Sequence, residues 1–286
     1  MRIALTGAGG FIGSVVLGYL NKQGIDDILI FDDLPHPEQF KNLVNKKFKV
    51  LFGSDDWGVP VDCVIHIGAN SNTLDTEWKD YYKSNVISTR EWHDWCKMKN
   101  IPFIFTSSAG VYGHGNGPVS QYAFSKAVSE GEIDSGVVLR LFNVYGPNEY
   151  HKGRMASTPF HWYNQVTETG KLKIFENSVE YYRDFIYVED VARVIWHFVQ
   201  NYKPGIYDVG TGCATNFETV ASYLLDNVKG KKKYIPMPED LYKQYQMWTR
   251  ADTGALTLAG VDITQFKTVK QGIAEYVDYL KTHRYY

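Results

Sequence analysis

The sequence has few of the residues that mark secreted, membrane-spanning or metal-dependent proteins. Its 286 residues include only three cysteines, Cys63, Cys96 and Cys213, which lie far apart and form no C-x-x-C pair. Such spacing suits a reducing compartment and gives a structural zinc site nothing to build on. No apolar run is long enough to cross a bilayer, and the first residues read as a strand and not as a signal peptide. We therefore expect a cytoplasmic protein with no bound metal and no membrane partner.

An excess of either charge is also absent. The 30 basic and 32 acidic residues give a net charge of −2 and are scattered along the chain. Proteins that bind a nucleic-acid backbone carry a basic surface, so we expect no nucleic-acid partner. Hydrophobic residues make up 44% of the chain, which is enough to fill a core, and the length allows one large domain or two unequal ones.

Short apolar runs alternate with segments of helical periodicity in the first half of the chain. The apolar runs are 2–7, 27–33, 61–69, 101–108 and 136–146. The longest helical segment is 78–99, where Trp92 and Trp95 suit packing better than ligand binding. Strands buried on both faces read as continuous apolar runs, and strands that alternate with helices form a parallel sheet. We predict an α/β fold with a doubly wound parallel (Rossmann) sheet.

The texture of the sequence changes after Gly146, where aromatic residues, prolines and polar residues mix with short elements. We predict a dinucleotide-binding Rossmann domain over residues 1–146 and a smaller C-terminal α/β substrate-binding domain over 147–286. Residues 183–200 read as a strand, a turn and a helix. We expect 183–211 to pack back on the first domain.

A glycine-rich turn joins the first strand to the first helix. In "TGAGGFIGS", Gly7, Gly10 and Gly13 permit a tight turn and close backbone approach to a pyrophosphate at the helix N-terminus. Asp32 ends the second strand, where a carboxylate accepts hydrogen bonds from the adenosine ribose. Asp33 adds a second negative charge that repels a 2′-phosphate, unless Lys41 swings in, so the charge pattern favours NAD over NADP.

Three further residues form a candidate proton-transfer group. Tyr122 and Lys126 in "QYAFSK" share a helix face, and a nearby ammonium favours the phenolate of a tyrosine, whose ordinary pKa is about 10. Ser108 ends the strand 101–108, at the sheet edge where open α/β sheets hold their ligands. Its hydroxyl can hold a reacting oxygen near the tyrosine.

The glycine turn, Ser108, Tyr122 and Lys126 resemble the extended short-chain dehydrogenase/reductase family, which includes nucleotide-sugar epimerases and dehydratases. "FNVYGP" (142–147) and "RDFIYVEDVA" (183–192) extend the resemblance over essentially the whole chain. "NVYGPNEYHKGRMAS" and "YQMWTRADTGALTLAG" are similar to the members that invert C6 of an ADP-linked heptose by transient oxidation and re-reduction. The resemblance implies a tightly bound NAD or NADP, with NADP the usual cofactor, a nucleotide-sugar substrate and a homo-oligomer.

The resemblance also implies roles for individual residues. Tyr122 is the catalytic acid/base, Lys126 holds the nicotinamide ribose, Ser108 orients the substrate, and Lys152 in the H-K-G motif is a second acid/base. A second such group is useful because the ketone must turn over before its other face is reduced. The remaining cofactor-binding positions are Phe11, Ile12, Ala69, Asn85 and Val144. The substrate-binding positions are Asn143, Arg154, His161, Phe175, Arg183 and Tyr245.

Several alternatives stay open at this point. Arg154 replaces a small residue of the family, which points to a modified or acidic sugar. A 4-epimerase is one alternative, and a 4,6-dehydratase is another, although Ala109 and Gly110 stand where dehydratases place an Asp–Glu pair. An ion pair with Asp184 or Glu180 is the structural alternative for Arg183. A cofactor-binding sensor without turnover would need none of Ser108, Tyr122, Lys126 and Lys152.

Overall fold

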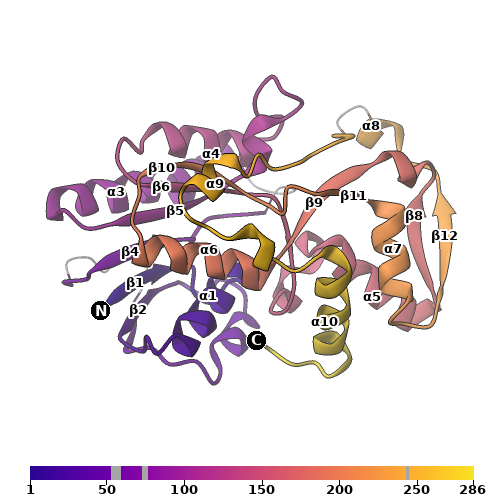
Figure 1. The fold of residues 1–286 in the computed structure, drawn as a ribbon, viewed down its shortest axis with the longest axis horizontal. Helices are drawn as coiled ribbons and strands as arrows, with labels where there is room; N and C mark the ends of the chain where they lie inside the picture. The colour runs from indigo at the N-terminus through magenta and orange to yellow at the C-terminus, as the bar shows by residue number, and fades with distance from the viewer. Residues whose placement is uncertain (53–58, 73–76, 243–244) are drawn as a thin grey trace.

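The computed structural model describes residues 1–52, 59–72, 77–242 and 245–286 (Figure 1). Within these residues, seven strands form one parallel sheet in the order β10-β6-β5-β4-β1-β2-β3. The strands are β1 (Ile3–Thr6), β2 (Ile28–Phe31), β3 (Val50–Phe52), β4 (Cys63–His66), β5 (Phe103–Ser108), β6 (Val137–Leu141) and β10 (Gly205–Val209). Strand order reverses between β1 and β4, so the predicted doubly wound α/β fold is confirmed.

Helices cover both faces of this sheet because alternate residues of each strand point to opposite sides. Ile3 and Leu5 of β1 belong to a core shared with α1 and α6, whereas Ala4 faces a core that contains Trp92 of α3. In Figure 1, α1 and α6 lie side by side along one face. The helices that cover the two faces are α1 (Phe11–Lys22), α3 (Ser88–Lys99), α4 (Gln121–Gly131) and α6 (Val188–Gln200).

A second core lies beside the large sheet and contains residues from two smaller sheets and three helices. The strands are β7 (Asn143–Tyr145), β8 (Lys171–Phe175), β9 (Tyr182–Tyr187), β11 (Ala214–Asn216) and β12 (Lys231–Ile235). The helices are α5 (Thr158–Thr169), α7 (Phe217–Leu225) and α10 (Val269–Lys281). Across the residues that the structure describes, no helix combines the length and the apolar character that a bilayer crossing requires.

Short elements complete the chain. They are α2 (Trp78–Tyr81), a π-helix η2 (Tyr82–Ile87), α8 (Glu239–Tyr242), α9 (Gly254–Leu258) and the 3-10 turns η1 (Gln39–Leu43), η3 (Ala109–Tyr112), η4 (Tyr150–Met155), η5 (Ser178–Glu180) and η6 (Ile263–Gln265). The long helical segment predicted over 78–99 is therefore present as α2, η2 and α3 in succession, with the π-helix between the two α-helices.

The single strand predicted over 136–146 is wrong, because the chain changes sheets within it. β6 ends at Leu141 in the large sheet, and β7 begins at Asn143 in a three-stranded sheet with β9 and β11. Between the two strands, the Phe142 N–H donates to the Val209 carbonyl oxygen at 3.0 Å. Both halves of the run are apolar, so the hydrophobic pattern alone does not reveal where the chain leaves one sheet for the other.

The strands β7 and β9 contribute to both cores. Val144 and Ile186 are paired neighbours that face the core of the large sheet. Tyr145, Phe185 and Tyr187 point the other way into the second core. This alternation follows from the two-residue period of a strand. As a result, one face of the three-stranded sheet packs in the core of the large sheet and the other face packs in the second core.

Two elements within 183–211 contact the large sheet or a helix that covers it. α6 packs against α1, and β10 pairs with β6 at the edge of the large sheet. Leu256 and Val261, which lie in the predicted substrate domain, also belong to the core of the large sheet. The division at residue 146, with 183–211 packed on the first domain, stays a prediction.

Candidate functional site

The glycine turn between β1 and α1 has no room for side chains at two positions. Gly7 has φ of +68°, and a Cβ on Gly13 would lie 2.0 Å from the Gly7 carbonyl oxygen. The helix α1 begins after Gly10 with no side-chain cap and no acidic residue in its first turn among the described residues. Its first N–H groups are therefore available to an anion, and the turn fits the pyrophosphate of a dinucleotide.

Asp32 holds this turn in place. Its carboxylate accepts hydrogen bonds from the Gly9 and Leu34 N–H groups, both at 2.8 Å. Burial raises the pKa of Asp32, while these two hydrogen bonds act to lower it. Asp33 is exposed beside it, and the Lys41 ammonium pairs with Glu38. Lys41, the basic side chain considered for a 2′-phosphate, is thus paired with an acidic neighbour.

The predicted cofactor position Asn85 lies in the π-helix and is almost fully buried. Its side chain binds the backbone of Asn70 in both directions, accepting from N–H at 2.7 Å and donating to the carbonyl at 3.1 Å. It also donates to the Ser125 hydroxyl on α4 at 2.8 Å. Asn85 therefore ties the segment that follows Ala69 at the carboxyl end of β4 to the helix that carries Tyr122 and Lys126.

Ser108 and Tyr122 meet at the carboxyl end of β5. The Ser108 hydroxyl caps η3 by accepting from the Gly110 N–H at 3.1 Å. Burial raises the pKa of Tyr122 to about 12, and a hydrogen bond with Ser108 acts in the opposite direction. The Tyr122 phenol is therefore protonated at neutral pH and lies within reach of a hydroxyl that can share a substrate oxygen.

In this structure burial, Ser108 and Tyr81 shift the pKa of Tyr122, and the predicted effect of Lys126 on it stays a prediction. The Lys126 ammonium is buried, donates to the Thr106 carbonyl oxygen at 2.9 Å and lies 4.7 Å from the centre of the Phe105 ring. Burial lowers the pKa of Lys126 to about 7, and Glu130 opposes this shift. A buried ammonium requires a hydrogen-bond acceptor, and here the Thr106 carbonyl is that acceptor.

Lys152 is brought to the glycine turn by η4. Its ammonium lies 5.1 Å from the centre of the Phe11 ring, in the first turn of α1. Burial lowers the pKa of Lys152, and the negative charge of Glu149 opposes that shift. The left-handed backbone of Gly153, with φ of +51°, ends the turn directly after Lys152. The predicted second acid/base therefore lies next to the predicted cofactor site, and Ile12 and Val144 are half-buried in the same core as Phe11.

An aromatic pocket of about 370 Å³ lies over the second core. Two predicted substrate residues, Phe175 and Tyr245, line it. The residues that we did not predict are Thr158, Trp162, Gln165, Lys173, Ile174, Ser178, Tyr181, Phe217 and Ile235. Trp162 and Phe217 could not be told from core residues by sequence, since buried aromatics and pocket aromatics share the same helical spacing.

Arg183 lies beside this pocket, against the ring of Tyr245. Its guanidinium lies 4.8 Å from the centre of the Tyr245 ring and donates to the Tyr182 carbonyl oxygen at 2.8 Å. Burial lowers the pKa of Arg183. The neighbouring Asp184 carboxylate instead accepts from the Thr211 and Gly212 N–H groups, both at 2.8 Å. Among the described residues Arg183 forms no ion pair, so the ion-pair alternative finds no support there.

Besides Ser108 and Arg183, three predicted substrate residues do not line the aromatic pocket. Asn143 and Arg154 are exposed, and the His161 ring nitrogen Nε2 lies 3.3 Å from the Arg154 carbonyl oxygen. His161 and Arg154 are thus neighbours on either side of the α5 N-terminus. Their assignment to the substrate remains a prediction.

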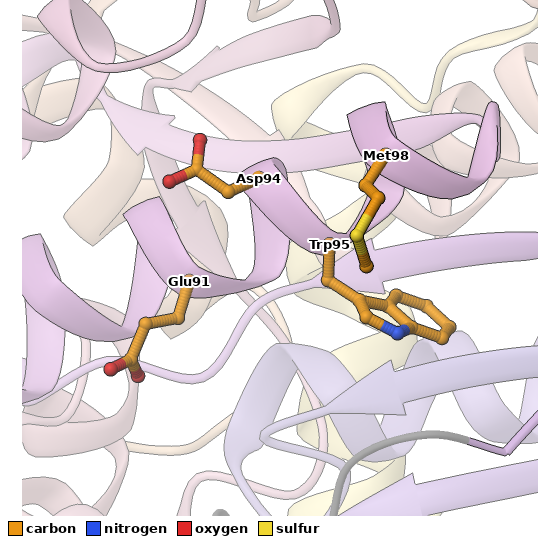
Figure 2. A pocket seen from close by; sticks show the side chains of 4 residues that line it. All are labelled: Glu91, Asp94, Trp95 and Met98. Carbon is orange, nitrogen blue, oxygen red and sulfur yellow. The ribbon is translucent and has the colours of Figure 1, made fainter.

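A second hollow, of about 430 Å³, lies on the outer side of α3. Figure 2 shows Trp95 and Met98 projecting to one side of this helix, with the Glu91 and Asp94 carboxylates directed away from the indole. Trp92 is buried on the inner side of the same helix. All four lining residues come from one helix, and none of them belongs to the predicted site.

Comparison with known proteins identifies the family. A model of the NAD dependent epimerase/dehydratase family matches residues 3–210. The chain is 39% identical, over 98% of its own length and 98% of the relative, to an ADP-L-glycero-D-manno-heptose-6-epimerase of Brachyspira hyodysenteriae. The crystal structure of the Helicobacter pylori ADP-L-glycero-D-manno-heptose-6-epimerase is similar with a TM-score of 0.86 and 25% identity, over 98% of this chain and 96% of that one.

A third similarity concerns the fold alone. The UDP-N-acetylglucosamine 4-epimerase of Methanobrevibacter ruminantium, in complex with UDP-N-acetylmuramic acid, has a TM-score of 0.85 at 22% identity, with 99% of each chain covered. The glycine turn, the paired Tyr122 and Lys126, and the family match over more than half of the residues lead to one conclusion. The chain belongs to the NAD dependent epimerase/dehydratase family.

Proposed function

We propose that the protein is a nucleotide-sugar epimerase that inverts C6 of an ADP-linked heptose. The observation that carries this proposal is the place of Lys152, whose ammonium lies against Phe11 at the start of the glycine-turn helix. Inversion of a carbinol carbon needs a proton-handling group for each orientation of the intermediate ketone. Tyr122 and Lys152 come from different elements, α4 and η4, and so can meet the oxygen from two directions.

Tyr122 is the first acid/base in this proposal. A nicotinamide cofactor, when bound, supplies reversible hydride transfer at C6. Because burial raises the pKa of Tyr122 to about 12, the phenol can donate a proton at neutral pH but needs a positive charge to lose one readily. Lys126 is the one basic residue of α4 and follows Tyr122 by one helical turn. Ser108 holds the sugar oxygen beside the phenol.

Lys152 is the second acid/base. Burial favours its neutral form, and the Glu149 charge favours its ammonium. A group of this kind can donate a proton to the ketone oxygen in one direction and remove it in the other. Its position beside Phe11 keeps that exchange next to the cofactor-binding turn.

The aromatic pocket and Arg183 are proposed to hold the nucleotide. Aromatic side chains such as Phe175 and Tyr245 offer flat surfaces for a purine base. A guanidinium binds two phosphate oxygens at once, and Arg183 lies directly beside the Tyr245 ring. Asn143, His161 and Arg154 complete the proposed substrate contacts by resemblance.

We propose NAD as the cofactor in preference to NADP. Asp32 and Asp33 place negative charge after β2, and Lys41 pairs with Glu38. The family resemblance supports a homo-oligomer with tightly retained cofactor, and the spacing of the three cysteines supports a cytoplasmic protein. Mass spectrometry of the nucleotide released on denaturation tests the choice, because NADP as the retained species would contradict the charge argument.

The decisive experiment is a substrate test. Purified protein is incubated with ADP-D-glycero-D-manno-heptose, and the configuration at C6 is followed by NMR. We expect interconversion of the two C6 epimers. Inversion of a UDP- or GDP-hexose at C4, with no change in the heptose, would favour a 4-epimerase, and loss of water would favour a dehydratase. Retained cofactor without turnover of any nucleotide-sugar would favour a sensor.

A further inference from the structure

Two adjacent polar side chains, Asn148 and Glu149, are fully enclosed just before Lys152. Their exposed fractions are 0% and 1%. Asn148 adopts a left-handed backbone with φ of +75°, which a non-glycine residue rarely does without a specific reason. A buried carboxylate and a strained buried amide are costly unless their partners are fixed, so the contacts of this pair indicate what it does.

Glu149 connects the Lys152 turn to α5 and α10. Its Oε2 accepts from the Ser157 N–H at 2.6 Å, and its Oε1 accepts from the Ser157 hydroxyl at 2.5 Å and the Tyr276 hydroxyl at 2.8 Å. Ser157 is the N-cap of α5, where the helix dipole favours negative charge. The Glu149 carbonyl oxygen also accepts from the Lys152 N–H at 3.0 Å and so closes the turn that carries Lys152.

Asn148 connects the Lys152 turn to α1 and the glycine turn. Its amide donates to the Ser14 hydroxyl on α1 at 2.9 Å, and its side-chain oxygen accepts from the Tyr286 N–H at 2.8 Å. Its carbonyl oxygen accepts from Asn42 at 3.2 Å, and Asn42 also donates to the Gly9 carbonyl oxygen at 2.9 Å. One end of the Lys152 turn is therefore linked to the glycine turn, and Glu149 links it to α5 and α10.

We propose that Glu149 is a positioning residue for Lys152, because its carbonyl and carboxylate oxygens hold the turn that carries the Lys152 ammonium between the glycine turn and α5. This inference rests on the proposed function of Lys152. The hydrogen bonds of the Glu149 carboxylate all come from neutral donors, Ser157 and Tyr276. Its charge is therefore not cancelled by a cationic partner in these contacts and acts on Lys152.

The other groups around Lys152 do not replace this charge. On the same turn, burial lowers the pKa of His151 to about 4, so its ring is neutral at pH 7. The His36 ring packs near His151 at 6.1 Å, and α1 presents the uncharged Phe11 ring. Burial lowers the pKa of Lys152, and the negative charge of Glu149 opposes this shift. Removing its charge therefore favours the neutral amine of Lys152.

The test compares Glu149→Gln with Glu149→Asp, and uses Glu168→Gln on the exposed side of α5 as the matched control. The pH dependence of Lys152 acetylation is measured by competitive labelling with acetic anhydride and peptide mass spectrometry, which needs no substrate. We expect Glu149→Gln to move the Lys152 titration to lower pH and to reduce kcat by about 10-fold or more with KM within about twofold. Glu149→Asp keeps the charge, so the titration stays near that of the wild type while kcat falls.

An unchanged Lys152 titration in folded Glu149→Gln overturns the inference. If Glu149→Gln does not fold, wild-type kcat in Glu149→Asp, with its carboxylate shortened by one methylene, overturns it equally. Thermal melting and retained cofactor report folding in each variant. If the wild type turns over no ADP-heptose, the proposed function fails, while the labelling comparison still decides whether Glu149 sets the charge state of Lys152.

Discussion

The ammonium of Lys152 lies 5.1 Å from the centre of the Phe11 ring, although 141 positions separate the two residues in the chain. A lysine over an aromatic face gains about 0.5–2 kcal/mol of attraction, more when water is excluded. This contact connects a loop that follows β7 with the first turn of the cofactor-binding helix. It also accounts for a lysine in a tight turn that would otherwise read as a solvated surface charge.

Lys152→Met should abolish most turnover. The variant keeps a side chain of similar length but loses the proton-exchanging group, so we expect kcat to fall at least about 100-fold. Steady-state kinetics with the nucleotide-sugar give the measurement. Lys171→Met, at an exposed position of strand β8, is the matched control and should keep wild-type activity. Full activity in Lys152→Met would remove this residue from the mechanism.

Tyr122→Phe tests the other acid/base. The ring still packs beside Tyr81, with centroids 6.3 Å apart, while the hydroxyl that meets Ser108 is lost. We expect kcat to fall at least about 100-fold and bound cofactor to remain. Turnover and the absorbance of retained cofactor are measured on the same sample. A variant with near-normal turnover would show that the phenol does not carry the proton.

Gly13→Ala should prevent cofactor retention. A Cβ at this position would lie 2.0 Å from the Gly7 carbonyl oxygen, so the glycine turn must open to admit it. Gly131→Ala at the end of α4 is the matched control, because a Cβ there meets no atom within 4 Å. Cofactor content per chain after gel filtration is the measurement. Equal cofactor content in the two variants would contradict the assignment of the turn.

The buried Lys126 should leave a signature in the pH dependence of stability. Its pKa is about 7 in the folded protein and about 10.5 when unfolded, so between these values the unfolded chain binds more protons. The free energy of unfolding should therefore rise with pH above 7 by up to about 1.4 kcal/mol per pH unit from this group. The free energy of unfolding in urea is measured from pH 6 to 9 for the wild type and for Lys126→Met. The difference between their slopes against pH gives the contribution of Lys126. Parallel curves for the cofactor-free proteins would refute a buried Lys126.

Arg183→Lys tests the nucleotide site. The substitution keeps one positive charge but loses the planar fork that binds two phosphate oxygens. A hydrogen bond to a charged group contributes about 1.5–3 kcal/mol, so we expect kcat/KM to fall roughly 10- to 100-fold, chiefly through KM. Kinetics over a range of substrate concentrations separate the two constants. An unchanged KM would place the diphosphate away from Arg183.

The sequence predicted the parts of the fold that depend on local pattern. The apolar runs around Leu5, Ile30 and Ile104 became buried parallel strands, because such runs suit a sheet covered on both faces. The glycine turn was equally readable, since its conformation restricts residue choice at Gly7 and Gly13. Both signals are carried by residues close together in the chain.

Features that depend on distant contacts were not predictable. The Lys126 ammonium turns to the Thr106 carbonyl because both are buried together, and no pattern in α4 indicates that choice. The pocket aromatics Trp162 and Phe217 look like core residues in sequence, and only their arrangement around an open volume distinguishes them. The exit of the chain at Phe142 from one sheet to another also depends on a tertiary contact, the hydrogen bond to Val209.

The three-stranded sheet that serves both cores has a consequence for any attempt to dissect the protein. Since Val144 and Tyr145 are consecutive residues committed to opposite sides, no cut in the chain yields a fragment with an intact interior. Fragment expression should give aggregates, and calorimetry of the whole chain should show one cooperative endotherm. A substitution that loosens the second core should then also disturb the large sheet. A variant engineered for a different nucleotide-sugar therefore has to be tested for its binding of the dinucleotide cofactor as well.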